Sequence, residues 1–567
     1  MKIYSSEISG SLKVRGDIFA ENYVVKSTVS TITQSFSSGS TIFGDSGDDT
    51  HQFTGSLFIS ASRIDLVDHD TLGTFLGFNA GTGSGDGTSN VGIGYEALTS
   101  PNGAQSVVAI GRGAGKNITK SSQSGVYSIL LGTNANYNNT AGSNVIAIGF
   151  GAGGHSSAGQ TNAILIGKQV GDAGAGPTNS VVIGHEAYGA GAGHAQYITA
   201  VGQQALFGSA STTTGINGAV AIGHQSLYSI TSAAGSVAIG YEASQALTSG
   251  ANQVSIGYQA GKALTTAANS TFIGYQAGLT HTGANNVAIG DRAFANTDAD
   301  SNSLASTQNV AIGNFAMGGA INNTVTGAVA IGYYALGSAT CGTSASKGVY
   351  IGYHANIYNG GGQNIVIGGN AMQTANGTET GNVAIGVSAM DSVDNDGSDY
   401  NTVVGNYAVR GGTGVISHNT VMGYQGMDQV GNHSSIKNTF IGYDAGGGIY
   451  AGDVTGNVGI GYQSLHGPMN GANYNVALGY VALSVVTTGD TNIGIGVSAG
   501  TDITTGSDNT IVGSSAGVLM TTTSNTVLIG KSAGAAINST DANGTVAVGY
   551  AALAALTEGV ANIAIGN

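Results

Sequence analysis

Short apolar segments recur along this chain, and each one ends at a glycine. The recurring phrase is clearest in NVGIGYEAL (90–98), QVSIGYQAG (253–261) and NVAIGVSAM (382–390). We call the glycine that follows each apolar segment the anchoring glycine. The commonest interval between these glycines is 17 residues and the mean is about 18, so the chain is a tandem array of very short units. The 28 anchoring glycines stand at positions 77, 94, 111, 132, 149, 167, 184, 202, 223, 240, 257, 274, 290, 313, 332, 352, 368, 386, 405, 423, 442, 461, 479, 496, 513, 530, 549 and 566.

The residues before the anchoring glycine have the pattern of a buried β-strand. The third residue before it is Val, Ile or Thr in all 28 copies, and the residue directly before it is Ile, Leu, Val or Met. These two side chains share one face, because strand side chains alternate between faces. The residue between them is also apolar in all copies except Ser255 and Tyr350. We therefore predict short strands that are buried on both faces.

The residues after the anchoring glycine predict a tight turn, since glycine tolerates positive φ and close backbone approach. Ala stands three residues later in 23 of the 27 copies that extend that far, and the exceptions are Val170, Ser226, Gly426 and Ser464. Such uniform smallness indicates a narrow space that a larger side chain would overpack. In 13 copies Asn stands four residues before the glycine. Stacked amides at that position would form a hydrogen-bonded ladder.

A unit of 17 to 18 residues with one strand is too short for a strand and a helix. It fits one turn of a β-solenoid, in which successive coils pair in parallel. We predict an all-β fold in which residues 71–567 form a parallel β-solenoid, or β-roll, of about 28 short turns, here called rungs. At the usual strand spacing of about 4.8 Å, the rungs would make a rod of roughly 130 Å.

Each rung has too few apolar side chains to be stable alone. It supplies about four or five apolar side chains, of which two are usually Ala, against an entropic cost of about 1–2 kcal/mol per ordered residue. The second apolar face of the strand would also stay in water in a single chain. Both problems disappear if several solenoids pack side by side. We therefore predict an obligate, elongated homo-oligomer with cyclic symmetry around its long axis, whose number of chains the pattern leaves open.

Composition and charge exclude several classes of function. The 567 residues include 15 basic and 30 acidic residues and no basic run, which argues against nucleic acid as a partner. Gly or a polar residue interrupts every apolar stretch before the roughly 20 residues of a membrane helix, so we expect no membrane insertion. Residues 1–22 lack the apolar core of a secretory signal. Cys341 is alone, which precludes an internal disulfide, and we expect it to be a small buried residue.

The consensus NVAIGY-x-A resembles the head repeat of YadA-like trimeric autotransporter adhesins, in which Ser-Val-Ala-Ile-Gly recurs in a left-handed parallel β-roll. It is also similar to the tandem AIGYQA repeats of bacteriophage tail-fibre proteins. The resemblance covers about residues 71–567. It implies three parallel chains, a homotrimer, in a needle that mediates attachment to a host cell surface. The adhesin repeat is near 14 residues and the repeat of this chain is longer, which leaves the coil shape and the handedness open.

The first 70 residues differ from the repeats. The segments 8–25, 39–60 and 61–67 read as short strands between Gly, Ser and Asp turns. They resemble the β-rich start of a phage fibre, which implies attachment to a virion tail or baseplate protein. A phage fibre is assembled in the host cytoplasm and needs no signal. The alternative is a bacterial cell-surface trimeric adhesin without its signal and anchor in this chain. The array ends inside a phrase, so we expect a further segment or another protein to cover its last rung.

Tyrosines suggest a site along the rod. Tyr follows the anchoring glycine directly in 11 copies and would line up with the period. Aromatic rings suit contact with sugars, so these tyrosines are a candidate glycan-contact stripe. The alternative, which we favour, is that the tyrosine rings pack between subunits or over the turn and keep their hydroxyl groups in solvent. The stripe comprises Tyr95, Tyr241, Tyr258, Tyr275, Tyr333, Tyr353, Tyr424, Tyr443, Tyr462 and Tyr480, with Tyr550 beyond them.

The sequence gives only weak evidence for a metal or cofactor site. Asp45, Asp48, Asp49 and His51 could bind Ca²⁺, but their spacing fits a solvated turn better. The glycines of residues 81–87 precede no helix, and the eleven His have no metal-type spacing, so we expect no cofactor and no metal.

An enzyme is also not expected. Glycoside hydrolysis would need paired carboxylates, as in a tailspike depolymerase. Glu96, Glu186 and Glu242 instead occupy one repeated position, two residues after the anchoring glycine, so we expect no catalytic residues. The longest interval, 290–313, is the best single place for a pocket.

Overall fold

The computed structural model describes Arg15 and residues 73–567, apart from 83–87, 100–102, 119–126, 141, 155–158, 173–175, 190–193, 209–214, 296–305, 320–324, 338–345, 359–360, 375–378, 394 and 396. The chain divides into two units, Met1–Asp65 and Leu66–Asn567. The β-rich attachment region that we predict for residues 1–70 therefore lies outside the described residues, except for Arg15. The following description concerns the second unit.

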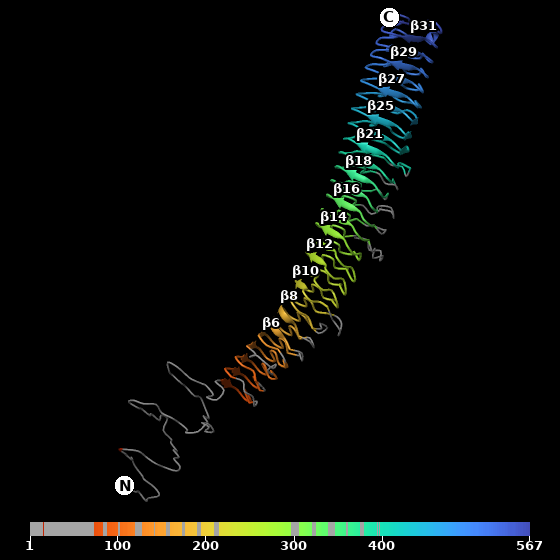
Figure 1. The fold of residues 1–567 in the computed structure, drawn as a ribbon. Coiled ribbons are helices and arrows are strands. Elements are labelled where there is room, and N and C mark those ends of the chain that lie inside the picture. The colour runs from red at the N-terminus through yellow and green to blue at the C-terminus, as the bar shows by residue number, and fades with distance from the viewer. Residues whose placement is uncertain are drawn as a thin grey trace. The chain divides into compact units, whose positions relative to one another are not determined.

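The second unit is a parallel β-solenoid, as predicted. Its 28-stranded sheet has one strand directly before each anchoring glycine, and Figure 1 shows the rungs stacked one above another. The strands are β1 (Thr74–Leu76), β2 (Val91–Ile93), β3 (Val108–Ile110), β4 (Ile129–Leu131), β5 (Val145–Ile148), β6 (Thr161–Ile166), β7 (Thr178–Ile183), β8 (Thr199–Val201), β9 (Val220–Ile222), β10 (Val237–Ile239), β11 (Val254–Ile256), β12 (Thr271–Ile273), β13 (Val287–Ile289), β14 (Val310–Ile312), β15 (Val329–Ile331), β16 (Val349–Ile351), β17 (Ile365–Ile367), β18 (Val383–Ile385), β19 (Thr402–Val404), β21 (Thr420–Met422), β23 (Thr439–Ile441), β25 (Val458–Ile460), β26 (Val476–Leu478), β27 (Ile493–Ile495), β28 (Thr510–Val512), β29 (Val527–Ile529), β30 (Val546–Val548) and β31 (Ile563–Ile565).

Little else is regular in the described residues. A second parallel sheet of three two-residue strands forms another side of the coil, and comprises β20 (Ile416–Ser417), β22 (Ser435–Ile436) and β24 (Val454–Thr455). The one helical element in the described part of the chain is the 3-10 turn η1 (Thr540–Ala542). The fold is therefore all-β, and most of each rung consists of turns.

Successive rungs pair in register. Val237 of β10 lies opposite Val254 of β11, and Ile239 lies opposite Ile256. The pairing continues around the corner, because the amide of Gln259 donates to the carbonyl oxygen of Tyr241 at 2.8 Å. Equivalent residues of the repeat therefore form continuous columns along the solenoid, and the chemistry of one position is repeated at every rung.

The anchoring glycines are required for two reasons. Their φ values lie between 128° and 149°, a backbone region that other residues rarely adopt. They also form the closest column, since a Cβ added to Gly257 would lie 2.2 Å from the carbonyl oxygen of Gly274 in the next rung. The second and fourth residues after the glycine are left-handed as well, as in Gln259 (φ 53°) and Gly261 (φ 59°). These angles turn the chain sharply, which confirms the predicted turn.

The core inside each coil is narrow. The middle residue of the strand points inward, and it packs with the Ala three residues after the anchoring glycine, which is buried from Ala97 to Ala552. In the rung of β10 the core side chains include Ala238, Ala243 and Leu247, all fully buried. This confirms that the conserved small residue fills a tight space and that each rung has few apolar side chains to bury.

The predicted asparagine ladder is also present. The side-chain Nδ2 of each Asn donates to Oδ1 of the Asn one rung earlier at 2.8–3.2 Å. The backbone amide of each Asn donates to the same oxygen. All these amides are buried, and the ladder satisfies polar groups that would otherwise be costly in the interior. The longest run comprises Asn382, Asn401, Asn419, Asn438, Asn457, Asn475, Asn492 and Asn509.

The last rung continues the winding. β31 pairs in parallel with β30, and its Ile563 and Ile565 are 74% and 79% exposed. Residues 550–567 do not fold back over this edge of the sheet. The expectation that a further segment or another protein covers the last rung stays a prediction.

Candidate functional site

The most extensive candidate surface is the outer side of the 28-stranded sheet. In most strands the middle residue is buried while the residues on either side of it are only half-buried. Several of the outer isoleucines are 36–43% exposed, among them Ile110, Ile129 and Ile222. The second apolar face therefore stays partly in water within one chain, as expected, because none of the described residues packs on the outer side. Burial of both faces in an assembly stays a prediction. We call these two outer columns, the third and first residues before each anchoring glycine, the outward face.

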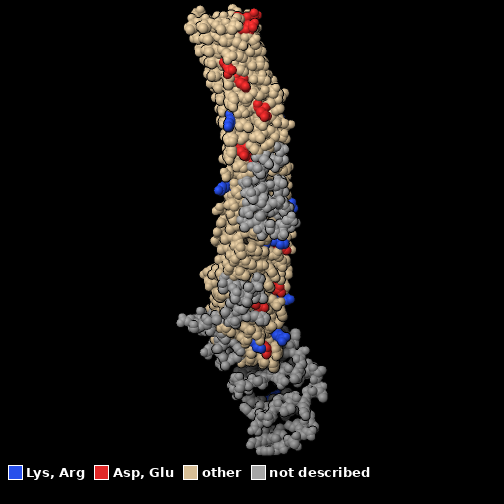
Figure 2. Space-filling view, turned by 90° about the vertical axis from the view of Figure 1, so that its right-hand side faces the viewer, with Lys and Arg blue, Asp and Glu red and all other residues tan. Residues whose placement is uncertain are grey.

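The outward face is large for an exposed apolar surface. Its two columns lie about 7 Å apart and run for about 130 Å, which gives an area on the order of 900 Å². Exposed apolar patches on monomeric proteins are usually a few hundred Å², and larger ones mark interaction surfaces. Neither column contains a charged residue. Lys, Arg, Asp and Glu side chains are also few and scattered on the side of the molecule that Figure 2 shows. The outward face is therefore large and apolar enough to be an interaction surface.

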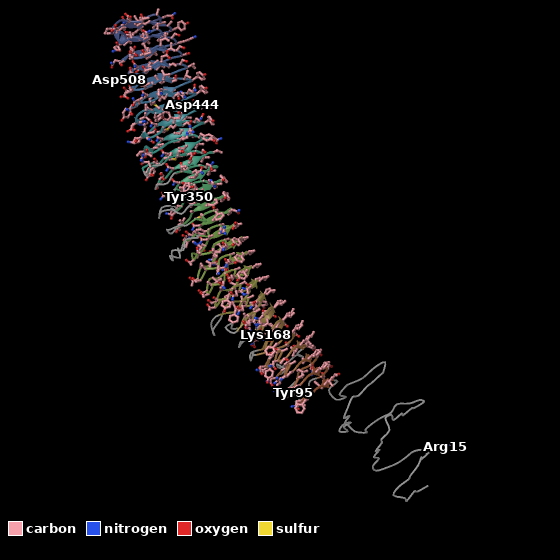
Figure 3. All side chains as sticks on the ribbon, turned by 180° about the vertical axis from the view of Figure 1, so that it is seen from behind. Arg15, Tyr95, Lys168, Tyr350, Asp444 and Asp508 are labelled. Carbon is pink, nitrogen blue, oxygen red and sulfur yellow. The ribbon has the colours of Figure 1, made fainter. Side chains whose placement is uncertain are left out.

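The ten tyrosines of the proposed stripe do line up along the solenoid. Each is 40–54% exposed, and many side chains project from the rod in Figure 3, where Tyr95 is labelled. Neighbouring rings stack in three runs, with centroids 5.0–5.4 Å apart and planes within 18° of parallel. The runs are Tyr241–Tyr258–Tyr275, Tyr333–Tyr353 and Tyr424–Tyr443–Tyr462–Tyr480. Tyr95 stacks on Phe78 instead, at 5.7 Å.

This stacking limits what the tyrosines can bind. Each inner ring has both faces covered by its neighbours. The run from Tyr241 to Tyr275 is closed at its ends by His224, stacked at 5.0 Å, and by Arg292, whose guanidinium lies 5.4 Å from the ring centroid. A sugar at this run would meet ring edges and hydroxyl groups, and not the ring faces that favour stacking. The glycan-contact stripe stays a prediction, and the rings from Tyr241 to Tyr275 and the inner rings Tyr443 and Tyr462 have both faces already occupied.

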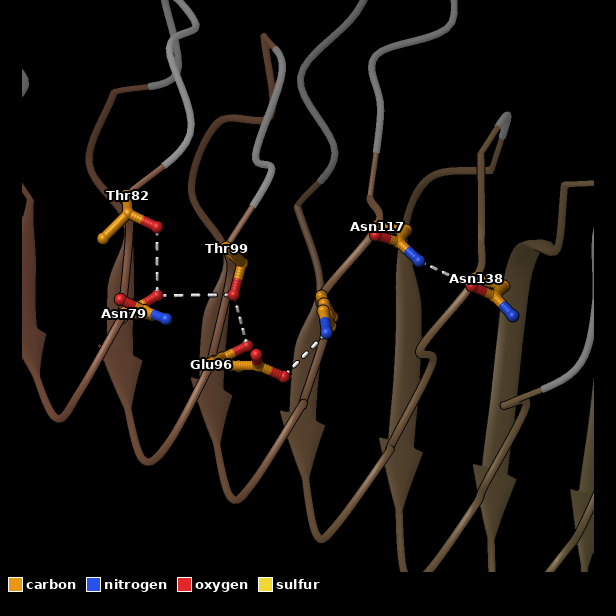
Figure 4. Close-up of polar contacts among 7 residues, drawn as sticks. Asn79, Thr82, Glu96, Thr99, Asn117 and Asn138 are labelled. Atoms are coloured by element: carbon orange, nitrogen blue, oxygen red, sulfur yellow. Dashed lines mark hydrogen bonds and ion pairs between the residues drawn. The ribbon is translucent and has the colours of Figure 1, made fainter.

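The glutamates at the repeated position stabilise the corner of the coil. Lys262 Nζ lies 2.6 Å from Glu242 Oε2, and Gln259 Nε2 donates to the same oxygen at 2.8 Å. Partial burial opposes ionisation of Glu242, yet hydrogen bonds from Lys262, Gln259 and Tyr241 hold its pKa below the usual value. Glu96 is paired similarly with Lys116 at 2.6 Å, as Figure 4 shows, and Glu186 accepts from Gln204 at 2.9 Å. These carboxylates act as links between rungs.

Several candidates lie outside the described residues. They are the acidic cluster Asp45, Asp48, Asp49 and His51, the lone Cys341, residues 83–87 of the glycine-rich stretch 81–87, and residues 296–305 of the interval 290–313. Within the part of the chain that the structure describes, no group of three or more His, Cys, Asp or Glu could hold a metal ion. No helix there is long and apolar enough to cross a membrane.

Comparison with known proteins gives no family. No protein-family model matches the chain, and no curated protein matches it. The functional argument therefore depends on the sequence pattern and on the geometry of the solenoid.

One hollow was missed by our sequence analysis. It lies at the fifth residue after the anchoring glycine, a position that we call the corner column. This column reads Tyr137, Gly154, Asp172, Gly189 and Phe207 over successive rungs, so that two glycines interrupt a column of larger side chains. A comparison of every repeat position across the rungs, including the positions that vary, would have revealed the gap between the two aromatic residues.

Proposed function

We propose that this chain is a structural fibre protein of a phage virion, a tail fibre or receptor-binding fibre, that mediates attachment to the host cell surface. The observation that carries the proposal is the outward face, an apolar strip repeated at every rung of a long solenoid. A protein that must be long and stiff gains both properties when identical rods share such strips. The resemblance of the NVAIGY-x-A phrase to fibre repeats supports the same function.

The assembly that we propose is a parallel homotrimer. Three solenoids around one axis can turn their outward faces toward each other, so that the β-branched columns of one chain pack against those of the next. Burying an apolar strip on the order of 900 Å² per chain would contribute roughly 20 kcal/mol at about 25 cal/mol per Å², before the costs of association. Such an interface would compensate for the lean core of each rung.

In this proposal the chain has two ends with different tasks. Residues 1–70 attach to a virion tail or baseplate protein, and the solenoid presents its surface to a glycan or protein of the host. The fibre is assembled in the host cytoplasm and becomes part of the virion. It is structural and adhesive, with no catalytic function.

Immunoelectron microscopy tests this function. Antibodies raised against residues 71–567 should label fibres on purified phage particles from the source culture. Labelling of a cell envelope in place of particles would overturn the phage assignment and favour the cell-surface adhesin. Release of sugars from host polysaccharide incubated with the assembled protein would instead indicate a depolymerase.

A further inference from the structure

The hollow in the corner column is bounded by two aromatic rings whose outer faces are covered. Tyr137 is covered by the ammonium group of Lys116 one rung earlier, which lies 5.7 Å from the ring centroid. Phe207 is covered by Tyr228 one rung later, stacked at 5.1 Å and 4°. The ion pair of Lys116 with Glu96 fixes the first of these covers, and its hydrogen bond raises the pKa of Lys116. The inner faces of both rings are directed toward the rungs between them.

Glycines create the space between the two rings. Gly154 stands one rung after Tyr137, and Gly189 stands one rung before Phe207. A Cβ on Gly189 would lie 2.3 Å from two atoms of the Phe207 ring, so the ring rests directly against the bare backbone. Gly151, at the second position after the anchoring glycine, widens the hollow in the rung of Gly154. Because Gly189 has no side chain, part of the Phe207 ring lies against its backbone, and the rest of that ring lines the second cavity.

The hollow consists of two adjoining cavities. One of about 160 Å³ is lined by Tyr137, Phe150, Gly154 and neighbouring polar residues, and one of about 100 Å³ is lined by Glu186, Gly189 and Phe207. Gln169 and Asp172 line both. The hollow therefore alternates an aromatic wall, a polar centre and a second aromatic wall along the rod.

We propose that this hollow binds a neutral oligosaccharide of at least three pyranose units. The inference rests on the proposed function and names the ligand class and the residues that recognise it. One sugar stacks on Tyr137 in the first cavity, at the height of Gly154, and another packs, at the height of Gly189, against the part of the Phe207 ring that lines the second cavity. These heights are two rungs, or about 10 Å, apart, which suits the first and third units of a trisaccharide. The middle unit donates its hydroxyls to Asp172 and Gln169.

Charge selects against acidic sugars at this site. Among the described residues, the charged side chains that line the two cavities are Asp172 and Glu186, and both are carboxylates. A uronate or sialate would place a third negative charge beside them, whereas neutral hydroxyl groups donate hydrogen bonds to carboxylates. In the run from Tyr241 to Tyr275, by contrast, every ring face is covered, so the hollow is a better sugar site than this part of the stripe.

Calorimetric titration of the assembled, full-length protein tests the proposal. The probes are the neutral trisaccharides maltotriose, cellotriose, mannotriose and triacetylchitotriose, with trigalacturonic acid as the acidic comparison. We expect at least one neutral trisaccharide to bind at millimolar concentration or better, and the acidic one not to bind. Phe207→Ala and Gly154→Gln should each weaken binding about tenfold or more, the first by removing a stacking face and the second by filling the hollow.

Tyr258→Ala is the matched control, because it removes an exposed tyrosine whose two ring faces are covered. It should leave the affinity unchanged, and circular dichroism should show that all three variants keep the β-signal. Binding by none of the neutral probes, unchanged affinity in both hollow variants, or loss of binding in Tyr258→Ala would each overturn the proposal. The virion assignment has its own readout, since antibody labelling of particles does not depend on sugar binding.

Discussion

The anchoring glycine is the residue on which the winding depends most. At φ values near 135° it turns the chain out of each strand, and in the same place it allows the backbones of consecutive rungs to approach. A side chain would be strained by the backbone angle and would also collide with the next rung. The phrase therefore keeps this residue in every copy while its neighbours vary.

We predict that Gly257→Ala destabilises the solenoid by on the order of 3 kcal/mol or more, because its Cβ would meet the Gly274 carbonyl oxygen at 2.2 Å. Gly369→Ala is the control. That glycine has ordinary φ, and the nearest atom to an added Cβ is 4.0 Å away, so its stability should change by less than about 1 kcal/mol. Chemical denaturation monitored by circular dichroism measures both. Equal effects would contradict the close-column explanation.

His281 gives the described solenoid a pH dependence. The His281 residue is 3% exposed, and the centroid of its ring lies 4.0 Å from that of the Phe294 ring. Its Nε2 donates to the Ser306 carbonyl oxygen at 2.9 Å. Burial lowers its pKa from 6.5 to about 4, although the bond to Ser306 opposes the shift. The unfolded chain therefore binds a proton between pH 6.5 and 4 that the folded chain does not bind. The stability due to neutral His281 is complete above pH 6.5 and is lost as pH falls toward 4.

Lowering the pH from 7 to 4.5 should therefore reduce the free energy of unfolding of the natural protein by on the order of 3 kcal/mol more than that of His281→Gln. Parallel denaturation curves at the two pH values measure this difference. The same pH response in both proteins would show that other groups are responsible.

At the scale of single elements, the asparagine ladder connects rungs that share little apolar surface. Each of the eight amides from Asn382 to Asn509 is buried and bonded to its neighbour. Removal of one amide, such as that of Asn438, takes away the Oδ1 that accepts from both the backbone N–H and the Nδ2 of the next Asn. A buried backbone N–H then has no partner, which costs more than the lost bond itself. The ladder is thus a cooperative feature of the sheet.

Asn438→Ala should accordingly lower stability by about 2–3 kcal/mol, because it breaks the links to Asn419 and Asn457. The partly exposed Asn117, which makes one side-chain bond to Asn138 at 2.7 Å (Figure 4), serves for comparison. Asn117→Ala should cost less than about 1 kcal/mol. A loss in Asn438→Ala no greater than in Asn117→Ala, measured by urea denaturation, would refute the cooperative ladder.

The strand, the turn and the ladder could all be predicted from the sequence, because each repeats one residue type at one position. Val, Ala and Ile before Gly240, and the equivalent residues of the other rungs, indicate a strand whatever they pack against. Which strand face lies inside the coil could not be predicted, since both faces are apolar. The coil geometry decides it by leaving room inside only for the middle residue, which is most often Ala.

The hollow between Tyr137 and Phe207 was not predicted, because it depends on what differs between rungs and not on what repeats. Gly154 and Gly189 are inconspicuous among 97 glycines. They become informative only when the solenoid places them in one column with two aromatic residues. The regular spacing of the tyrosines predicted their alignment but not their stacking. The period that aligns the rings also places their faces against one another.

For the whole molecule, the central claim is that the outward face is a contact between copies of this chain. Within one chain, β-branched and aliphatic side chains stay half-exposed at every rung, and the interior of the coil is too narrow to compensate. Packing of identical rods would bury the half-exposed side chains and would add the apolar contacts that the narrow interior lacks. A single folded rod in dilute solution is therefore not expected.

Light scattering coupled to size-exclusion chromatography tests this claim most directly. The account predicts an elongated particle with three times the chain mass of 55.8 kDa at all concentrations where the β-signal persists. The double variant Val254→Lys, Ile256→Lys, which places two charges on the outward face, should reduce that mass or abolish folding. A stable, folded particle with the mass of one chain would contradict the account.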